Sequence, residues 1–158
     1  MPTMNRLLLL DLHYTFAIDE SWHRGTRLVD RIPKETYRTW IIELASENDA
    51  LVILTTARPE IYGRDTLARI EEATCWTPDD AFFRQIEAQP HVAKEHNLDR
   101  IIDRYGEPTE DWVAFESNER TRSMYRRRGI KAVQVHRRPP LTFWPGDGEE
   151  PEHPFAVL

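Results

Sequence analysis

A polar side chain directly follows each of three short apolar runs that lie far apart in the sequence. Asp11, Thr55 and Glu116 each follow such a run. Lys94 stands near the start of a helical pattern, where a cation is mildly unfavourable for the helix, so its position suggests a chemical role. A hydroxyl and an ammonium group could hold a phosphate, and two carboxylates could hold Mg²⁺ through oxygen ligands.

The residues that follow Thr55 add to this phosphate-binding pattern. Thr56 could offer a second hydroxyl, Arg58 could form a bidentate contact, and the next helix begins nearby with free backbone N–H groups. A structural role is the alternative at each position: a turn at Asp11, a helix cap at Thr55 and Thr56 with a solvated Arg58, and another cap just after Glu116. The residue types alone leave these alternatives open.

Strand and helix patterns alternate along the chain and predict how these side chains are positioned. Short apolar runs predict buried strands, and stretches with apolar residues at helical spacing predict helices. The strands are expected at 7–10, 51–54, 81–83, 112–115 and 130–135, and the helices at 33–47, 61–73, 92–105 and 119–128. The alternation predicts an α/β fold, a Rossmann-like three-layer sandwich with a mostly parallel central sheet, whose ligands bind at the carboxyl ends of the strands.

Length and composition limit the class of protein. The chain has 158 residues, of which 40% are hydrophobic and 30% charged, as expected for a single globular domain. Its net charge of −6 argues against general electrostatic binding to nucleic acid, and its single cysteine excludes an intrachain disulfide. No apolar run suits a membrane span or a signal peptide, so we expect a cytoplasmic protein without membrane contact.

The last part of the chain differs in composition from the rest. Five of the 11 prolines fall within residues 139–158, which excludes a regular helix or a central strand there. We therefore expect one domain over residues 1–138 and a proline-rich tail over 139–158 that is either packed on the domain or mobile.

The order of Asp11, Thr55, Lys94 and Glu116 on successive elements resembles the haloacid dehalogenase-like (HAD) superfamily. Only 44 residues separate Asp11 from Thr55, which is similar to members with a minimal cap. More narrowly, the chain resembles the phosphatase domain of bacteriophage polynucleotide kinase–phosphatases. The matching features are the stretch 55–60 with Arg64 and Thr66, then 83–84, Lys94 and 113–129.

The resemblance implies a set of catalytic residues. Asp11 would be the nucleophile that forms an aspartyl-phosphate, and Thr55 and Lys94 would hold the transferred phosphoryl group. Mg²⁺ would be the cofactor, with Asp11, the backbone carbonyl of His13 and Glu116 as its ligands. His13 stands where the family carries a second aspartate, which serves as general acid and base. An imidazole can take this role.

The resemblance also implies how substrate is bound. Thr56, Arg58 and Arg84 would contact the phosphate or the rest of a phosphorylated small molecule or nucleic-acid end. The family usually carries two aspartates at positions 116 and 117, whereas this chain has Glu116 and Ser117, which removes one negative charge.

Three functions remain open from the sequence. The first is an Mg²⁺-dependent phosphomonoesterase that acts on a nucleotide or a polynucleotide end. The second is a catalytically degenerate HAD-like domain that binds phosphate or a protein partner, which the two changed carboxylates favour. The third is a phosphotransferase or dehalogenase-type enzyme that uses the same nucleophile. The oligomeric state does not follow from the sequence.

Overall fold

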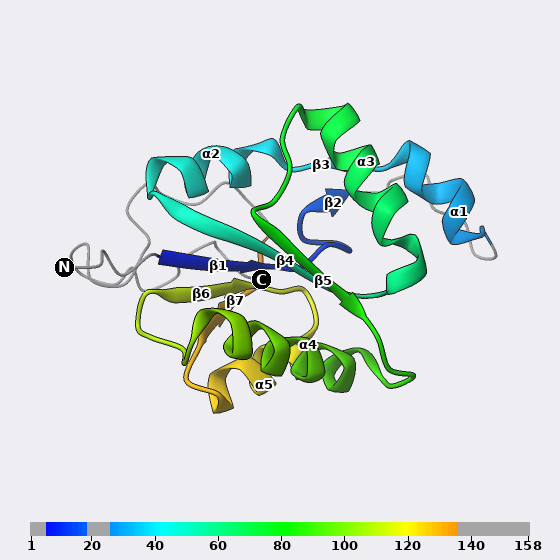
Figure 1. Cartoon of the computed structure of the whole chain (residues 1–158). Coiled ribbons are helices and arrows are strands. Elements are labelled where there is room, and N and C mark those ends of the chain that lie inside the picture. The colour runs from blue at the N-terminus through cyan, green and yellow to red at the C-terminus, as the bar shows by residue number, and fades with distance from the viewer. Residues whose placement is uncertain (1–5, 19–25, 136–158) are drawn as a thin grey trace.

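A parallel sheet forms the centre of the protein. The structure is a computed structural model that describes residues 6–18 and 26–135, and these include a five-stranded sheet in the order β5–β4–β1–β6–β7 (Figure 1). Its strands are β1 (Arg6–Leu10), β4 (Ala50–Pro59), β5 (Asp80–Arg84), β6 (Trp112–Phe115) and β7 (Lys131–Val133). Every pairing within this sheet is parallel. The predicted α/β, Rossmann-like fold is therefore confirmed.

Helices cover both faces of this sheet. Helices α2 and α3 lie on one face, and α4 and α5 lie on the other (Figure 1). The helical elements are α1 (Leu28–Arg31), α2 (Thr39–Glu47), α3 (Gly63–Thr74), α4 (Pro90–Tyr105), α5 (Glu119–Arg127) and the 3-10 turns η1 (Ile32–Lys34) and η2 (Glu60–Tyr62). Each long connection thus returns the chain to the same end of the sheet, as parallel strands require.

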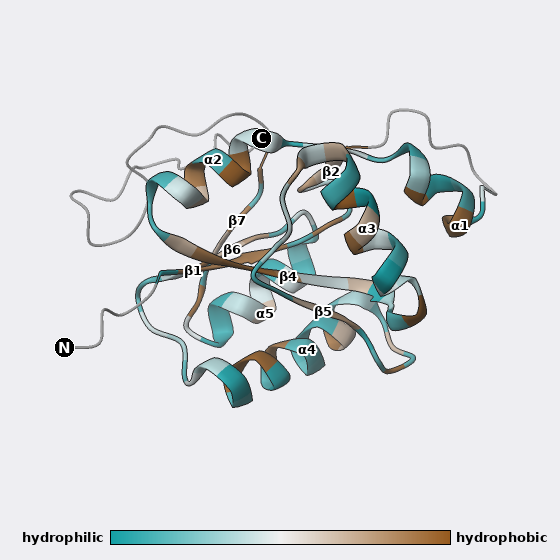
Figure 2. Ribbon diagram, turned by 45° about the horizontal axis from the view of Figure 1, so that its top comes forward, coloured by the Kyte–Doolittle hydropathy of each residue, from teal (hydrophilic) through white to brown (hydrophobic). Residues whose placement is uncertain are grey.

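The central strand β1 contributes to two separate hydrophobic cores. Successive side chains of a strand point to opposite faces, so Leu8 and Leu10 pack on the side of α2, whereas Leu7 and Leu9 pack on the side of α4 and α5. All four leucines are buried. Figure 2 shows brown, apolar residues along the central strands, between helices in which hydrophilic and hydrophobic residues alternate. A continuous apolar run at this position is what burial on both faces demands.

The segment between β1 and α2 differs from the sequence prediction. A single helix was expected over 33–47, but a short antiparallel pair, β2 (Ala17–Ile18) and β3 (Thr36–Tyr37), precedes a helix that begins at Thr39. Tyr37 is buried in the pair, and Glu35 is buried by partners outside the segment. These tertiary contacts override the helical spacing of the local sequence.

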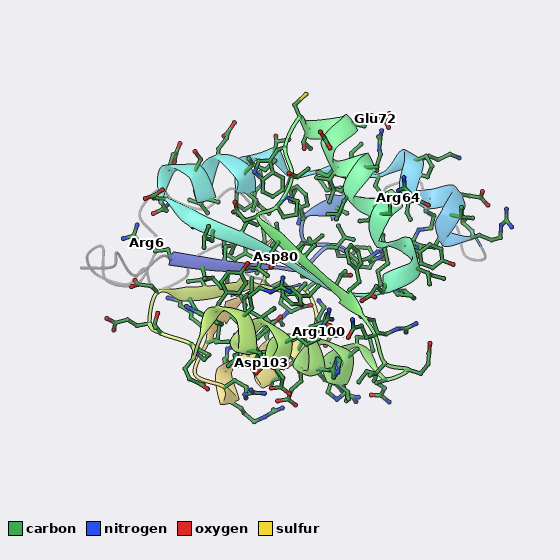
Figure 3. The ribbon with its side chains drawn as sticks, in the orientation of Figure 1. Arg6, Arg64, Glu72, Asp80, Arg100 and Asp103 are labelled. Carbon is green, nitrogen blue, oxygen red and sulfur yellow. The ribbon has the colours of Figure 1, made fainter. Side chains whose placement is uncertain are left out.

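The ends of the helices follow local rules. Helix α4 begins with Pro90, and its C-cap Gly106 has a φ of 91°. The Asn118 side chain accepts a hydrogen bond from the backbone N–H of Thr121 and so caps α5. Charged residues occupy the outward sides of the helices, as for Arg64 and Glu72 on α3 and Asp103 on α4 (Figure 3).

Two further sequence predictions concern the domain boundary and contact with a membrane. The proposed boundary at 138 and the proline-rich tail over 139–158 lie outside the described residues, so both stay predictions. Among the helices that the structure describes, none combines the length and the apolar character that a membrane span requires.

Candidate functional site

Three charged side chains meet at the carboxyl edge of the sheet. Asp11 follows β1 and Glu116 follows β6, and these strands pair in parallel, so the two carboxylates are brought to the same edge. Lys94 reaches them from the first turns of α4, and its Nζ contacts Asp11 Oδ1 and Glu116 Oε2. Each of the three residues is at most 4% exposed. The structure therefore brings together these three sequence-predicted residues.

The charges of this cluster do not balance, because two buried carboxylates share one ammonium group. Burial works to lower the pKa of Lys94, but the carboxylates of Asp11 and Glu116 outweigh it and raise that pKa. Burial, reinforced by the neighbouring charge of Asp11, raises the pKa of Glu116 to about 7 despite the ammonium of Lys94. A second cation at this place would relieve the surplus negative charge.

The loop after β1 holds the second oxygen of Asp11 in place. Asp11 Oδ2 accepts hydrogen bonds from Thr15 Oγ1 at 2.9 Å and from Ser117 Oγ at 3.0 Å. The Phe16 backbone N–H donates to the Asp11 carbonyl at 3.2 Å, which closes the loop on itself. Asp11 thus offers one oxygen to Lys94 and the other to hydroxyl groups.

Ser117, which the sequence marked only as a missing carboxylate, contributes its hydroxyl to the site. Its Oγ lies 3.1 Å from the His13 carbonyl oxygen as well as 3.0 Å from Asp11 Oδ2. A hydroxyl has a single proton, so it donates to one of these oxygens at a time. A carboxylate oxygen, a backbone carbonyl and a hydroxyl thus converge on one spot, next to the strand end already predicted to be functional.

These three oxygens are the donors that a hard cation such as Mg²⁺ prefers. Both oxygens of the predicted ligand Glu116 have other partners, since Oε2 contacts Lys94 and Oε1 accepts from the Asn118 backbone N–H at 3.0 Å. Within the described part of the chain, no group of three or more acidic, histidine or cysteine side chains could hold a metal ion. Asp11 Oδ2, the His13 carbonyl and the Ser117 hydroxyl are thus the oxygens that could hold such a cation.

His13 lies at the mouth of the site, beside a cation that the sequence did not predict. Nη2 of Arg31, from α1, is 3.1 Å from His13 Nδ1. The His13 ring also packs edge-on with Tyr14, with ring centroids 4.1 Å apart. Burial and the charge of Arg31 lower the pKa of His13, and the carboxylate of Asp11 opposes them only in part. The neutral imidazole is therefore favoured near neutral pH.

The two threonines on β4 have different surroundings. Strand β4 continues to Pro59 and shifts register between Thr55 and Pro59, so the strand does not end at Thr55 as predicted. Thr56 lines the pocket at the strand ends, whereas Thr55 is not among the lining residues. Oγ1 of Thr55 instead accepts a 3.3 Å hydrogen bond from Nδ2 of Asn97 on α4. Of the two hydroxyl residues, Thr56 has the better access to a ligand.

Arg58 is engaged by a buried carboxylate. Its Nη1 and Nη2 lie 3.0 Å and 2.6 Å from the two oxygens of Glu35, and Nη1 also donates to Thr66 Oγ1 at 3.0 Å. Glu35 is fully buried, and its backbone carbonyl accepts from Arg69. Arg58 borders the pocket, but its guanidinium serves to tie the segment before β3 to β4.

Arg84, also predicted to bind substrate, lies apart from the other predicted site residues. Arg84 lines a second pocket with Pro59, Tyr62 and Glu87, and its Nη2 is 3.4 Å from Glu87 Oε1. The pocket at the strand ends, here named the first pocket, has a volume of about 420 Å³ and does not include Arg84 among its lining residues. The lining residues of the first pocket are Asp11, His13, Tyr14, Leu28, Arg31, Thr56, Ala57, Arg58, Pro90, Lys94, Glu116, Ser117 and Asn118.

Comparison with known proteins adds one finding about the fold. No protein-family model and no curated protein matches the chain. Solved structures do match, and one of them is a chain of the Pnkp1/Rnl/Hen1 complex, with a TM-score of 0.62 and 16% sequence identity. The match covers 84% of this chain and 47% of that chain, so this protein spans about half the length of its structural neighbour. At this identity the likeness establishes a shared fold.

Proposed function

We propose that this protein is an Mg²⁺-dependent phosphohydrolase of the HAD type, which removes a phosphate from a nucleotide or a polynucleotide end. The observation that carries the proposal is the buried cluster of Asp11, Lys94 and Glu116 on the floor of an open pocket at the carboxyl edge of the sheet. The motif order in the sequence and the likeness to a chain of the Pnkp1/Rnl/Hen1 complex both support it.

Asp11 is the group that would attack phosphorus. An oxygen of its carboxylate forms a bond to the phosphorus atom while the bond to the ester oxygen breaks, and the departing alkoxide takes up a proton. Water then hydrolyses the aspartyl-phosphate and restores the carboxylate. Lys94 holds the attacking carboxylate and neutralises charge on the phosphoryl group, and the Thr56 hydroxyl is placed to donate to a phosphate oxygen.

Mg²⁺, bound by Asp11 Oδ2, the His13 carbonyl and Ser117, would supply positive charge to the phosphate oxygens. His13 is mostly neutral near neutral pH because its pKa is lowered, and its Nδ1 must part from Arg31 Nη2 before it can accept a proton from the attacking water. It is less suited to protonate the leaving oxygen, since the protonated form is scarce near neutral pH. We therefore expect slow turnover with esters whose leaving group needs a proton.

Assays with a set of variants test this function. With Mg²⁺, wild type should release phosphate slowly from nucleotide phosphates and faster from p-nitrophenyl phosphate, whose leaving group needs no proton, and Asp11→Asn should release none from either. His13→Asp should raise the rate with nucleotide phosphates by restoring an acid, whereas the surface control Asp103→Asn should leave it unchanged. If wild type and His13→Asp are both inert toward every ester, the phosphatase proposal is wrong.

The metal site has its own test. Ser117→Asp adds a carboxylate beside Asp11 Oδ2 and the His13 carbonyl, so Mg²⁺ should bind more tightly by calorimetric titration. Ser46→Asp, on the exposed side of α2, changes the net charge equally and should leave Mg²⁺ affinity unaltered. Equal affinities in the two variants would count against a metal at this spot.

A phosphate-binding domain without turnover is the second candidate. Its specific support is that both oxygens of Glu116 already have donors and that His13 has a lowered pKa. On this alternative, phosphate binds to wild type with a measurable affinity, while no variant at position 13 releases phosphate from an ester.

A further inference from the structure

Tyr14 adopts a backbone conformation that is unfavourable for its side chain. Its φ is +64°, in the left-handed region where the Cβ of an L-residue crowds the following carbonyl. Glycine and asparagine are the usual residues there, and a bulky aromatic residue is an outlier. Such strain persists when the surrounding structure imposes it, and it gathers at functional sites.

The fold holds the backbone of Tyr14 firmly in this conformation. Nη1 of Arg38 donates to the Tyr14 carbonyl at 3.1 Å and to the Thr15 carbonyl at 2.9 Å. The Thr15 side chain is buried and bonded to Asp11, which fixes the next position. The turn is therefore required to orient Asp11, and it would tolerate a glycine at position 14 better than a tyrosine.

Burial does not explain the tyrosine, because Tyr14 is 56% exposed. Tyr14 lines the first pocket together with the apolar residues Leu28, Ala57 and Pro90. The edge-on contact with His13 uses at most one face of the Tyr14 ring, because the two rings are nearly perpendicular. A planar group that enters the pocket can therefore stack on the ring.

The distance from the nucleophile suits a nucleotide. Tyr14 is three residues after Asp11, so their Cα atoms are at most about 10 Å apart. The pocket volume of about 420 Å³ falls in the range of small-molecule sites, about 300–1,000 Å³. Its floor carries the charged cluster of Asp11, Lys94 and Glu116, and part of its wall is apolar, which matches a substrate with a phosphate at one end and an aromatic ring at the other.

We propose that Tyr14 is a specificity-determining residue that stacks on the nucleobase of a substrate whose phosphate lies at Asp11. This inference rests on the proposed function for the position of the phosphate. Stacking on an aromatic side chain accepts any base, because every base has a π-face. The pocket would therefore distinguish nucleotides from sugar phosphates without selecting one base.

The test compares adenosine monophosphate with the ribose phosphate that lacks the base. Wild type should prefer the nucleotide in kcat/KM, and Tyr14→Gly should reduce this preference about tenfold, the size of effect that loss of one stacked base produces. Tyr14→Phe keeps the ring and should keep the preference. Ile61→Ala removes an exposed apolar side chain outside the first pocket and should also keep it.

A binding experiment separates the two proposals. In the Asp11→Asn background, calorimetry should show that Tyr14→Gly weakens adenosine monophosphate about tenfold relative to inorganic phosphate. If no ester is hydrolysed but this binding difference is found, the proposed function fails and the stacking role stands. If esters are hydrolysed and Tyr14→Gly leaves both the preference and the binding ratio unchanged, the stacking role is refuted and the function stands. If adenosine monophosphate neither binds nor reacts, the stacking role is refuted, and the proposed function fails with it when no other phosphate ester is hydrolysed.

Discussion

Replacing Lys94 by methionine would leave two buried carboxylates without their shared counter-charge. Like lysine, methionine is unbranched, so the change mainly removes the ammonium group that contacts Asp11 and Glu116. Removal of one partner from a buried ion pair costs about 3–5 kcal/mol of stability. We expect Lys94→Met to lose an amount in this range at neutral pH, measured by urea unfolding followed through tryptophan fluorescence.

The pH dependence of this loss follows from the pKa of Glu116. In wild type that pKa is raised to about 7, so the folded state holds a proton that the unfolded state releases, and the contribution of Glu116 to stability falls as pH rises from about 4.5 to about 7. Without Lys94 the pKa of Glu116 moves higher still. Stability of the variant should then continue to fall above pH 7 by about 1.4 kcal/mol per pH unit, where the wild-type curve levels off.

Two comparisons make this reasoning refutable. Lys34→Met, at an exposed lysine, should change stability by no more than about 0.5 kcal/mol. Adding Glu116→Gln to Lys94→Met removes one of the two carboxylates and should recover much of the loss in a double-mutant cycle. If the gap between wild type and Lys94→Met is the same from about pH 5 to about pH 8, the loss reflects packing and the charge argument is wrong.

Three further outcomes are expected. Glu116→Gln alone should abolish the fall in stability between about pH 4.5 and about pH 7 and raise stability by about 3 kcal/mol above that range, measured by urea unfolding across pH. Glu35→Gln should destabilise by about 3–5 kcal/mol because Arg58 loses its buried counter-charge, and a loss under 1 kcal/mol in thermal unfolding would contradict this. Tyr14→Gly should raise stability by about 0.5–1 kcal/mol, since relief of left-handed strain exceeds the entropy cost of glycine, and Cys75→Gly at the C-cap of α3, with a φ of +56°, should show a comparable gain.

The fold could be predicted because its signals are local. The run Leu7–Leu10 is apolar at every position, which indicates burial on both faces, and the two cores divide its side chains in that way. The meeting of Asp11 with Glu116 then follows from parallel strands that end at one edge. Lys94 was identified because a cation is unexpected near a helix N-terminus, and its contact with both carboxylates accounts for its position.

The remaining features of the site depend on partners that are distant in sequence. Nothing in the local pattern around Glu35 indicates that Arg58, 23 residues away, takes up its charge, and so Arg58 was expected to face a phosphate. Likewise, Thr56 rather than Thr55 lines the pocket, and β4 shifts its register against β5 just after Thr55. The contacts of Ser117 with the loop after β1 join residues more than 100 positions apart. Such pairings follow only from the assembled structure.

The ion pair between Glu35 and Arg58 also holds one wall of the first pocket in place. Glu35 joins η1 to β3, next to the helix that carries Arg31 over the pocket, and its pairing with Arg58 fixes this segment to the sheet. Swinging the segment away would separate Arg58 from Glu35 and from the Thr66 hydroxyl and would unpack the buried ring of Tyr37. The wall of the pocket is therefore preorganised. A ligand meets it already in place, and little of its binding energy is spent on closing a lid.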